Sequence, residues 1–153
     1  MYSYYNLLYI YFDGASRNNP RGPAGCGWVI YEDDYGNIGG EIARGQKYLG
    51  YNISNNQAEY EGVEAALQFM QDNDIGCDEL CIRGDSEVVL KQLDGVYRVR
   101  SRNITEYYNA VVELLSNIEH NYILYEHVPR YENERADELA NDAINEEESY
   151  VWD

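Results

Sequence analysis

The chain has 153 residues, of which 44% are hydrophobic, enough for one domain with a substantial core. Its 28 acidic and 11 basic residues give a net charge of −17, which argues against nucleic acid as a partner because phosphate affinity comes from lysine and arginine. However, most of the basic residues cluster at residues 17–21, 91–102 and 130–135. The charge is therefore uneven, and local basic segments remain available.

Membrane, secreted and zinc-binding proteins are disfavoured. The first eight residues lack the charged and apolar parts of a signal peptide, and no apolar run approaches a membrane span. Three cysteines are an odd number, and the Cys77 and Cys81 pair lacks the second pair that a zinc site needs. We expect free thiols in a reducing, cytoplasmic compartment. We also expect a monomer with no obligate protein partner and no membrane contact.

The first predicted strand, residues 9–14, is a short apolar run that carries Asp13 to its carboxyl end. Residues 14–23 are rich in turn formers and predict a loop. Strands at 24–31 and 40–49, separated by a turn at 32–36, then complete a three-stranded antiparallel meander.

A helix follows at residues 55–73, with one apolar face that includes Val63 and Ala66. Glu59 belongs to that face, four residues before Val63. An inward carboxylate is costly unless it is paired or bound to a cation. Glu59 is therefore a candidate ligand.

Asp85 directly follows the fourth predicted strand, residues 79–84, and begins a helix that extends through Leu93. An aspartate at this place is also a good helix N-cap, so Asp85 by itself admits a purely structural role. A helix at 104–118 and a fifth strand at 122–128 come next.

The last predicted helix, residues 134–145, carries Asp137 near its amino-terminal end. Residues 146–153 are strongly acidic, and we expect a disordered tail there, after a catalytic domain formed by residues 1–145.

This order of elements predicts an α/β fold with a five-stranded mixed sheet, three antiparallel strands followed by two parallel ones, flanked by helices. Ligands of such sheets gather at the carboxyl ends of parallel strands, where Asp13 and Asp85 fall. Helix starts with Glu59 and Asp137 could meet them there. Four clustered carboxylates need a counter-charge, and Mg²⁺ and Mn²⁺ prefer oxygen ligands. Two such ions can promote phosphoryl transfer, so the pattern favours metal-dependent cleavage of a phosphodiester.

Four motifs in order carry a resemblance to a known family. They are Y-F-D-G-A at 11–15, S-N-N-Q-A-E at 54–59, G-D-S at 84–86 and N-E-R-A-D-E-L-A at 133–140. The sequence resembles a type 1 ribonuclease H over residues 9–145. It is similar to the shorter archaeal-like and plant-like members, because the lysine-rich protrusion of some bacterial members is absent. The resemblance implies a ribonuclease H-like fold and an endonuclease that hydrolyses the RNA strand of RNA/DNA hybrids, leaving 5′-phosphate and 3′-hydroxyl ends.

The resemblance also implies the role of each acidic residue. Asp13 would bridge two Mg²⁺ ions, for which Mn²⁺ could substitute. Asp137 would complete the site of the ion that activates water, and Glu59 and Asp85 would hold the ion on the leaving-group side. His127, ten residues before Asp137, matches the family's mobile histidine, which assists proton transfer or product release.

Substrate contacts are implied by the same resemblance. The candidates are Gly14, Asn19, Asn55, Asn56 and Gln57 for the minor groove of the hybrid, and Arg98 and Arg100 in the short basic segment. Without the protrusion, we expect weak hybrid binding that falls steeply with salt. Two alternatives stay open: a nucleic-acid-binding module without the chemistry, and the same fold acting on double-stranded RNA or a DNA junction.

Overall fold

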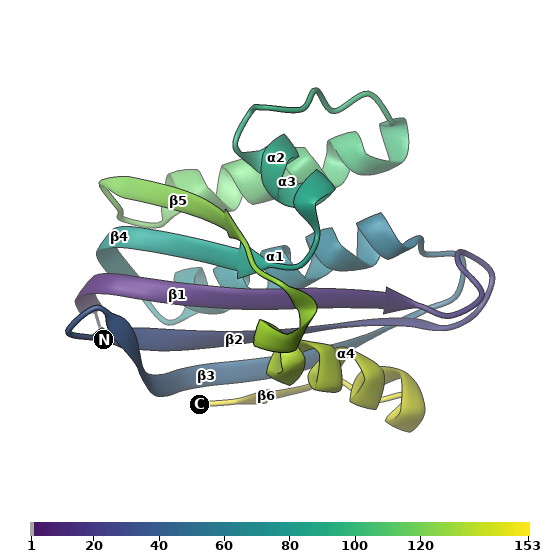
Figure 1. Cartoon of the computed structure of the whole chain (residues 1–153), viewed down its shortest axis with the longest axis horizontal. Helices are drawn as coiled ribbons and strands as arrows, with labels where there is room; N and C mark the ends of the chain where they lie inside the picture. Colours follow the sequence, from purple (N-terminus) through teal and green to yellow (C-terminus); the bar gives the residue numbers. More distant parts are fainter. Residues whose placement is uncertain (1) are drawn as a thin grey trace.

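A single mixed sheet with helices on both faces forms the body of the protein (Figure 1). The computed structural model describes residues 2–153. Within that range the strands are β1 (Ser3–Ser16), β2 (Ala24–Asp34), β3 (Asn37–Gly50), β4 (Ile75–Gly84), β5 (Tyr122–His127) and β6 (Tyr150–Trp152). The helices are α1 (Asn55–Asp72), α2 (Glu87–Leu93), α3 (Arg102–Asn117) and α4 (Glu134–Glu146), with one short 3₁₀ turn at Arg130–Glu132. None of these helices is long and apolar enough to cross a membrane.

The strand order is β5-β4-β1-β2-β3-β6. Strands β1, β2 and β3 are antiparallel, whereas β1, β4 and β5 run parallel, as the sequence predicted. In the parallel part, Phe12 lies opposite Gly84, and Gly84 lies opposite His127. Strands β4 and β5 therefore end beside Phe12, whereas β1 continues to Ser16, and Asp13, Asp85 and His127 lie together at this end of the parallel part of the sheet.

The acidic tail is partly ordered, contrary to expectation. Residues Tyr150–Trp152 form β6, which pairs antiparallel with β3 and gives the sheet six strands instead of five. The Arg44 guanidinium lies over the Trp152 ring at 4.9 Å, and the Gln46 side chain donates a hydrogen bond to Glu146 at 2.8 Å. Without β6, the edge of β3 would leave backbone N–H and C=O groups unpaired. We infer that hydrogen bonds to this edge stabilise the tail more than repulsion among its acidic side chains destabilises it.

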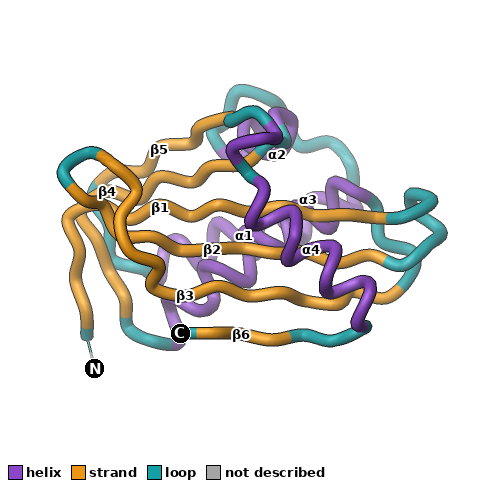
Figure 2. Tube along the Cα trace, turned by 60° about the horizontal axis from the view of Figure 1, so that its bottom comes forward, coloured by secondary structure: helices purple, strands orange, loops and turns teal. Residues whose placement is uncertain are grey.

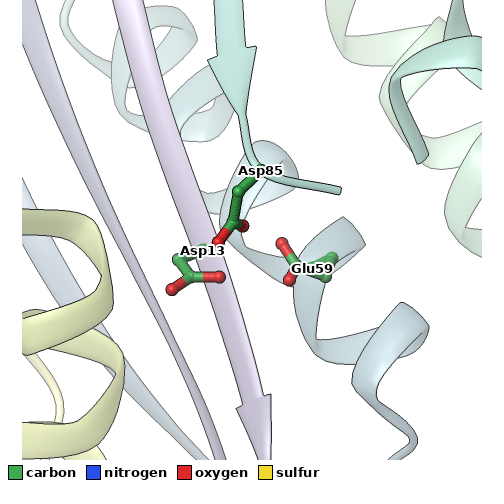
Figure 3. Close-up of side chains that lie close together, drawn as sticks. All are labelled: Asp13, Glu59 and Asp85. Carbon is green, nitrogen blue, oxygen red and sulfur yellow. The ribbon is translucent and has the colours of Figure 1, made fainter. Parts of the chain in front are cut away.

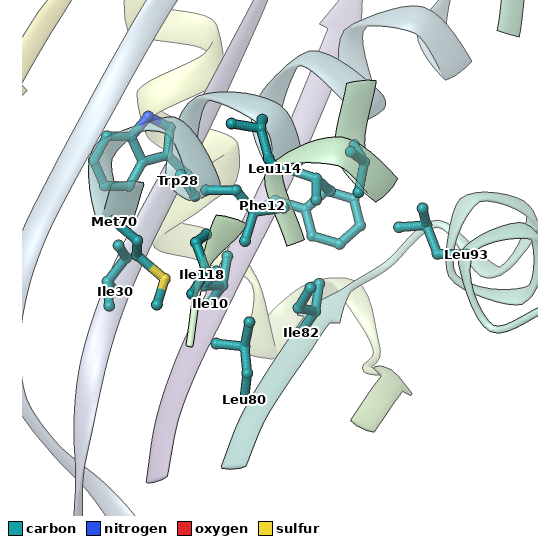
Figure 4. Packing of buried hydrophobic residues seen from close by; sticks show 14 of the residues in the cluster. Ile10, Phe12, Trp28, Ile30, Met70, Leu80, Ile82, Leu93, Leu114 and Ile118 are labelled. Atoms are coloured by element: carbon teal, nitrogen blue, oxygen red, sulfur yellow. The ribbon is translucent and has the colours of Figure 1, made fainter. Parts of the chain in front are cut away.

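The two faces of the sheet are covered unequally (Figure 2). Helices α1, α2 and α3 enclose the main apolar core, in which alternate β1 residues Leu8, Ile10 and Phe12 are fully buried. Figure 4 shows how Ile10 and Phe12 pack among side chains from neighbouring elements. Helix α4 packs on the opposite face, against β1, β2 and β3. The end of β1 thus lies between helices from both layers.

Two glycines set the distance between the helices and the sheet. A Cβ at Gly14 would lie 2.3 Å from the backbone nitrogen of Glu59, and one at Gly27 would lie 2.5 Å from the carbonyl oxygen of Ala136. No side chain fits at either place without a shift of the backbone, so α1 comes close to the sheet at Glu59 and α4 comes close at Ala136, next to Asp137. Gly14 was predicted to contact substrate. The packing of α1 on β1 requires a glycine at this position whether or not it does so.

Candidate active site

Three carboxyl groups from three separate elements meet at the end of β1. Asp13 lies on β1, Glu59 in α1, and Asp85 directly after β4. Oxygen atoms of the three residues all lie within 4.8 Å of one another, and Figure 3 shows the carboxyl groups gathered in one place. This convergence is the one expected from the strand ends and the helix start.

The start of α1 is held in a defined place by a capping box. The Ser54 hydroxyl accepts a hydrogen bond from the Gln57 backbone N–H at 3.1 Å, and the Gln57 side chain accepts one from the Ser54 N–H at 2.8 Å. Glu59 follows in the next turn. The capping box fixes the start of α1, and the close approach of Gly14 to the Glu59 backbone fixes the distance of the helix from β1. Together these two features orient the Glu59 side chain toward Asp13.

Burial makes the charged state of this cluster unfavourable without a cation. Only 4% of Asp13 and 8% of Glu59 is exposed. Burial, together with the nearby charge of Asp85, raises the pKa of Asp13 to about 8. Burial and the charge of Asp13 likewise raise the pKa of Glu59 well above its ordinary value. One Glu59 oxygen, Oε2, is buried and has no hydrogen-bond partner among the described residues. Hard oxygen donors, mutual repulsion and an unsatisfied buried oxygen together fit a divalent cation.

Asp137 lies beside this cluster and lines the same cleft, which has a volume of about 420 Å³. Its position is defined within α4, where the Asn141 side chain donates hydrogen bonds to the Asp137 carboxylate at 3.2 Å and to its carbonyl oxygen at 3.0 Å. The Arg130 guanidinium approaches the same carboxylate at 3.8 Å. Asp137 is more exposed than Asp13, and its carboxylate already interacts with Asn141 and Arg130.

Asp85 is not the cap of α2. Ser86 takes that position, and its hydroxyl accepts a hydrogen bond from the Val89 N–H at 3.4 Å. The structural alternative considered for Asp85 is therefore wrong, and its carboxylate remains available to the cluster. The exposed side chain of His127 lies next to it, with Nε2 3.2 Å from the Asp85 carbonyl oxygen.

The predicted substrate contacts fall into two groups. The Asn19 side chain accepts a hydrogen bond from the Asn55 N–H at 3.1 Å, and the Asn55 side chain accepts one from the Ser16 N–H at 2.9 Å. These bonds join the loop after β1 to the start of α1, beside Asn56 and Gln57. Arg98 and Arg100 are exposed in the connection between α2 and α3 and do not line the carboxylate cleft.

The cleft also has residues with long polar side chains that had no predicted role. They are Arg17, Arg130 and Asn141. Arg17 contacts Asn141 at 3.3 Å, and Asn141 in turn holds Asp137. The spacing of four residues between Asp137 and Asn141 is the sequence signal that could have identified this pair on a helix.

A mixed sheet with a carboxylate cluster at the end of its central strand defines the class of metal-dependent ribonuclease H-like proteins. Residues 11–143 match the family described as reverse transcriptase-like. RNase H1 from the halophilic archaeon Halobacterium salinarum is 40% identical, with a TM-score of 0.80, covering 92% of this chain and 99% of that one. LC11-RNase H1, solved in complex with an RNA/DNA hybrid, is 36% identical, with a TM-score of 0.78 and coverage of 92% and 98%. The chain belongs to the type 1 ribonuclease H family.

Curated relatives are longer than this chain. Ribonuclease HI of Halobacterium salinarum is 42% identical over 139 residues, which are 91% of this chain and 65% of that protein. Bifunctional protein Rv2228c of Mycobacterium tuberculosis is 36% identical over 133 residues, which are 87% of this chain and 34% of that protein. The chain therefore spans less than two thirds of the length of each.

Proposed function

We propose that this chain is an endonuclease that hydrolyses the RNA strand of RNA/DNA hybrids, with residues 1–145 as its catalytic domain. The observation that carries the proposal is the convergence of Asp13, Glu59 and Asp85 around a buried oxygen of Glu59 that has no hydrogen-bond partner within residues 2–153. A module that only binds nucleic acid has no use for such uncompensated charge. The similarity to LC11-RNase H1, a protein solved with a hybrid, supports this choice of substrate.

Divalent metal fits the residues present, and we propose Mg²⁺, with Mn²⁺ as a substitute. Asp13, Glu59 and Asp85 would hold one ion, and Asp13 with Asp137 a second one. When bound, such ions supply an activated water and stabilise the leaving 3′-oxygen, so the products are 5′-phosphate and 3′-hydroxyl ends. Burial and the repulsion from Asp85 raise the pKa of Asp13, and a bound cation would offset both by supplying positive charge to the deprotonated carboxylates.

The other cleft residues orient the reacting groups. The Gly14 N–H donates a hydrogen bond to Asp13 Oδ1 at 2.9 Å and so fixes one carboxylate oxygen. Arg17 and Arg130 bring positive charge to a cleft that would otherwise repel a phosphodiester. We assign proton transfer at the edge of the site to His127, because its ring is exposed to water and lies beside Asp85.

Recognition of the hybrid depends on shape and on 2′-hydroxyl groups, so cleavage should be largely independent of sequence. We propose minor-groove contacts by residues around the loop after β1 and the start of α1, and phosphate contacts by the basic segment before α3. The first set is Gly14, Asn19, Asn55, Asn56 and Gln57, and the second is Arg98 and Arg100. We further propose that the enzyme acts as a monomer in the cytoplasm.

The deciding experiment is cleavage of end-labelled RNA/DNA hybrid, double-stranded RNA and double-stranded DNA, each with Mg²⁺, Mn²⁺ or EDTA. We expect metal-dependent cutting of the RNA strand of the hybrid that disappears in the Asp13→Asn variant. Cleavage of double-stranded RNA in preference to the hybrid would show that the proposed substrate is wrong and that the proposed metal-dependent hydrolysis is right. Binding of hybrid with no cleavage under either metal would contradict the proposal and favour a binding module.

A further inference from the structure

Asn133 is a buried polar residue that connects β1 to α4. Only 1% of it is exposed, and its side-chain Nδ2 donates a hydrogen bond to the carbonyl oxygen of Phe12 at 2.8 Å. Phe12 is the residue immediately before Asp13. The side chain of Asn133 therefore holds the backbone of β1 at the point where the strand delivers its carboxylate.

The backbone of the same residue holds α4. The carbonyl oxygen of Asn133 accepts a hydrogen bond from the Asp137 N–H at 3.1 Å, the first such bond of the helix. One residue thus contacts the chain next to Asp13 through its side chain and Asp137 itself through its backbone. These two carboxylates lie on different elements, β1 and α4, and Asn133 is hydrogen-bonded to both elements.

The conformation of Asn133 is not explained by helix capping. It occupies the N-cap position of α4, where asparagine usually accepts a hydrogen bond from a backbone N–H of the first turn. The described chain contains no such capping bond at α4. The Asn133 oxygen Oδ1 is instead buried without a partner among residues 2–153. The missing capping bond and the unpaired buried oxygen are each unfavourable for stability. The hydrogen bond to Phe12 is therefore the feature that accounts for the orientation of the Asn133 side chain.

We infer that Asn133 is a positioning residue that holds Asp137 at the distance from Asp13 that the reaction requires. This inference rests on the proposed function and deepens it, because it names the residue through which α4 is aligned with β1. Asn133 touches neither the substrate nor the reacting atoms in this role. Residues that support metal ligands in this way typically change metal affinity or activity by about 10- to 100-fold when they are replaced.

The variant Asn133→Ser tests the inference without relying on a loss of folding. Serine is a good N-cap, so α4 should keep its start, but its side chain is too short to reach the Phe12 carbonyl. We expect kcat for hybrid cleavage to fall by about 10- to 100-fold with little change in KM. In the absence of nucleic acid, Mn²⁺ binding measured by electron paramagnetic resonance should weaken as well.

Leu139→Ala is the matched control. Leu139 also lies on α4, is 2% exposed and packs beside Gly27 of β2, and it takes no part in the two hydrogen bonds that join Asn133 to Phe12 and Asp137. This variant should lower the Tm but keep kcat and Mn²⁺ affinity when assayed well below its Tm. Wild-type values of kcat and Mn²⁺ affinity in Asn133→Ser, or equal losses in both variants, would overturn the inference.

Failure of the proposed function would give a different pattern. A wild-type protein that binds Mn²⁺ but cuts no hybrid would contradict the proposed function. The role of Asn133 would then be decided by Mn²⁺ affinity alone. Weaker binding in Asn133→Ser than in Leu139→Ala would support it, and equal binding in the two variants would reject it.

Discussion

Adjacent residues of β1 contribute to the protein in opposite ways. Leu8, Ile10 and Phe12 are fully buried in the main core, where each side chain contributes about 1.5–3 kcal/mol by leaving water. Asp13 follows directly, and it is nearly as buried but carries a carboxylate whose pKa is raised to about 8 by burial and by the charge of Asp85. One strand thus carries side chains that stabilise the core and, directly after them, a buried carboxyl group whose ionisation is unfavourable. The contrast indicates that the buried carboxyl groups lower the stability of the metal-free fold, as expected for the proposed cation site.

The largest effect should come from Asp13→Asn, which we expect to abolish cleavage of the hybrid while raising the Tm of the metal-free protein at neutral pH. The amide removes one of three crowded carboxylates, and each kcal/mol gained raises the Tm of a domain of this size by about 2–4 °C. Calorimetry in EDTA measures the Tm, and the hybrid assay measures activity.

Glu106→Gln is the control for the loss of one charge, because Glu106 is exposed on α3, away from the cleft. It should change neither property appreciably. A lower Tm in Asp13→Asn than in the wild type would show that the cluster does not destabilise the metal-free fold.

Ile10→Ala should have the opposite pattern. Replacing this fully buried core residue should lower the free energy of unfolding by about 2–5 kcal/mol through lost burial and a cavity. Cleavage measured well below the Tm should persist, since the carboxylates are untouched. Urea denaturation followed by circular dichroism gives the first quantity. Loss of cleavage in a folded Ile10→Ala protein would mean that the two regions of β1 are not independent.

The pH dependence of stability sharpens the same contrast. Between the ordinary Asp13 pKa of 3.8 and the folded value of about 8, the folded protein holds a proton that the unfolded chain lacks. The free energy of unfolding of the metal-free protein should therefore fall as pH rises through this window, by about 1.4 kcal/mol for each pH unit. Urea denaturation in EDTA from pH 5 to pH 8 measures this slope.

Asp13→Asn should show a flatter slope, because one of the two buried carboxyl groups with a raised pKa is gone. Excess Mg²⁺ should also reduce the loss at high pH, because the cation binds the deprotonated carboxylates. Identical slopes in the wild type and the variant would contradict the assignment to Asp13.

The smallest effect concerns the outer edge of the sheet. Trp152→Ala removes the ring over which the Arg44 guanidinium lies at 4.9 Å, and Trp152 is 37% exposed. We expect a loss of about 0.5–1 kcal/mol in the free energy of unfolding and no change in cleavage. Tyr35→Ala, at a side chain that is 99% exposed in the β2–β3 turn, is the control and should change neither. A loss of activity in Trp152→Ala would place β6 in the function of the site.

The sequence by itself determined the order of the elements and the acidic residues that meet. The turn formers, the apolar run at residues 9–14 and the helical spacing around Glu59 are local signals, and they can be recognised without knowledge of the fold. The convergence of Asp13, Glu59 and Asp85 also followed, because the ends of parallel strands share one edge of a sheet.

Only the tertiary structure decided the features that depend on a distant partner. The tail looks too acidic to be ordered until the free edge of β3 is known to be beside it. Asn133 looks like a helix cap until the Phe12 carbonyl, 121 positions away in the sequence, is seen to accept its hydrogen bond. The unsatisfied oxygen of Glu59 is likewise visible only when its surroundings are assembled. Contacts between residues that are distant in the sequence depend on which hydrogen-bonding groups are still unpaired after helices and strands have formed. Local sequence patterns do not show which groups these are.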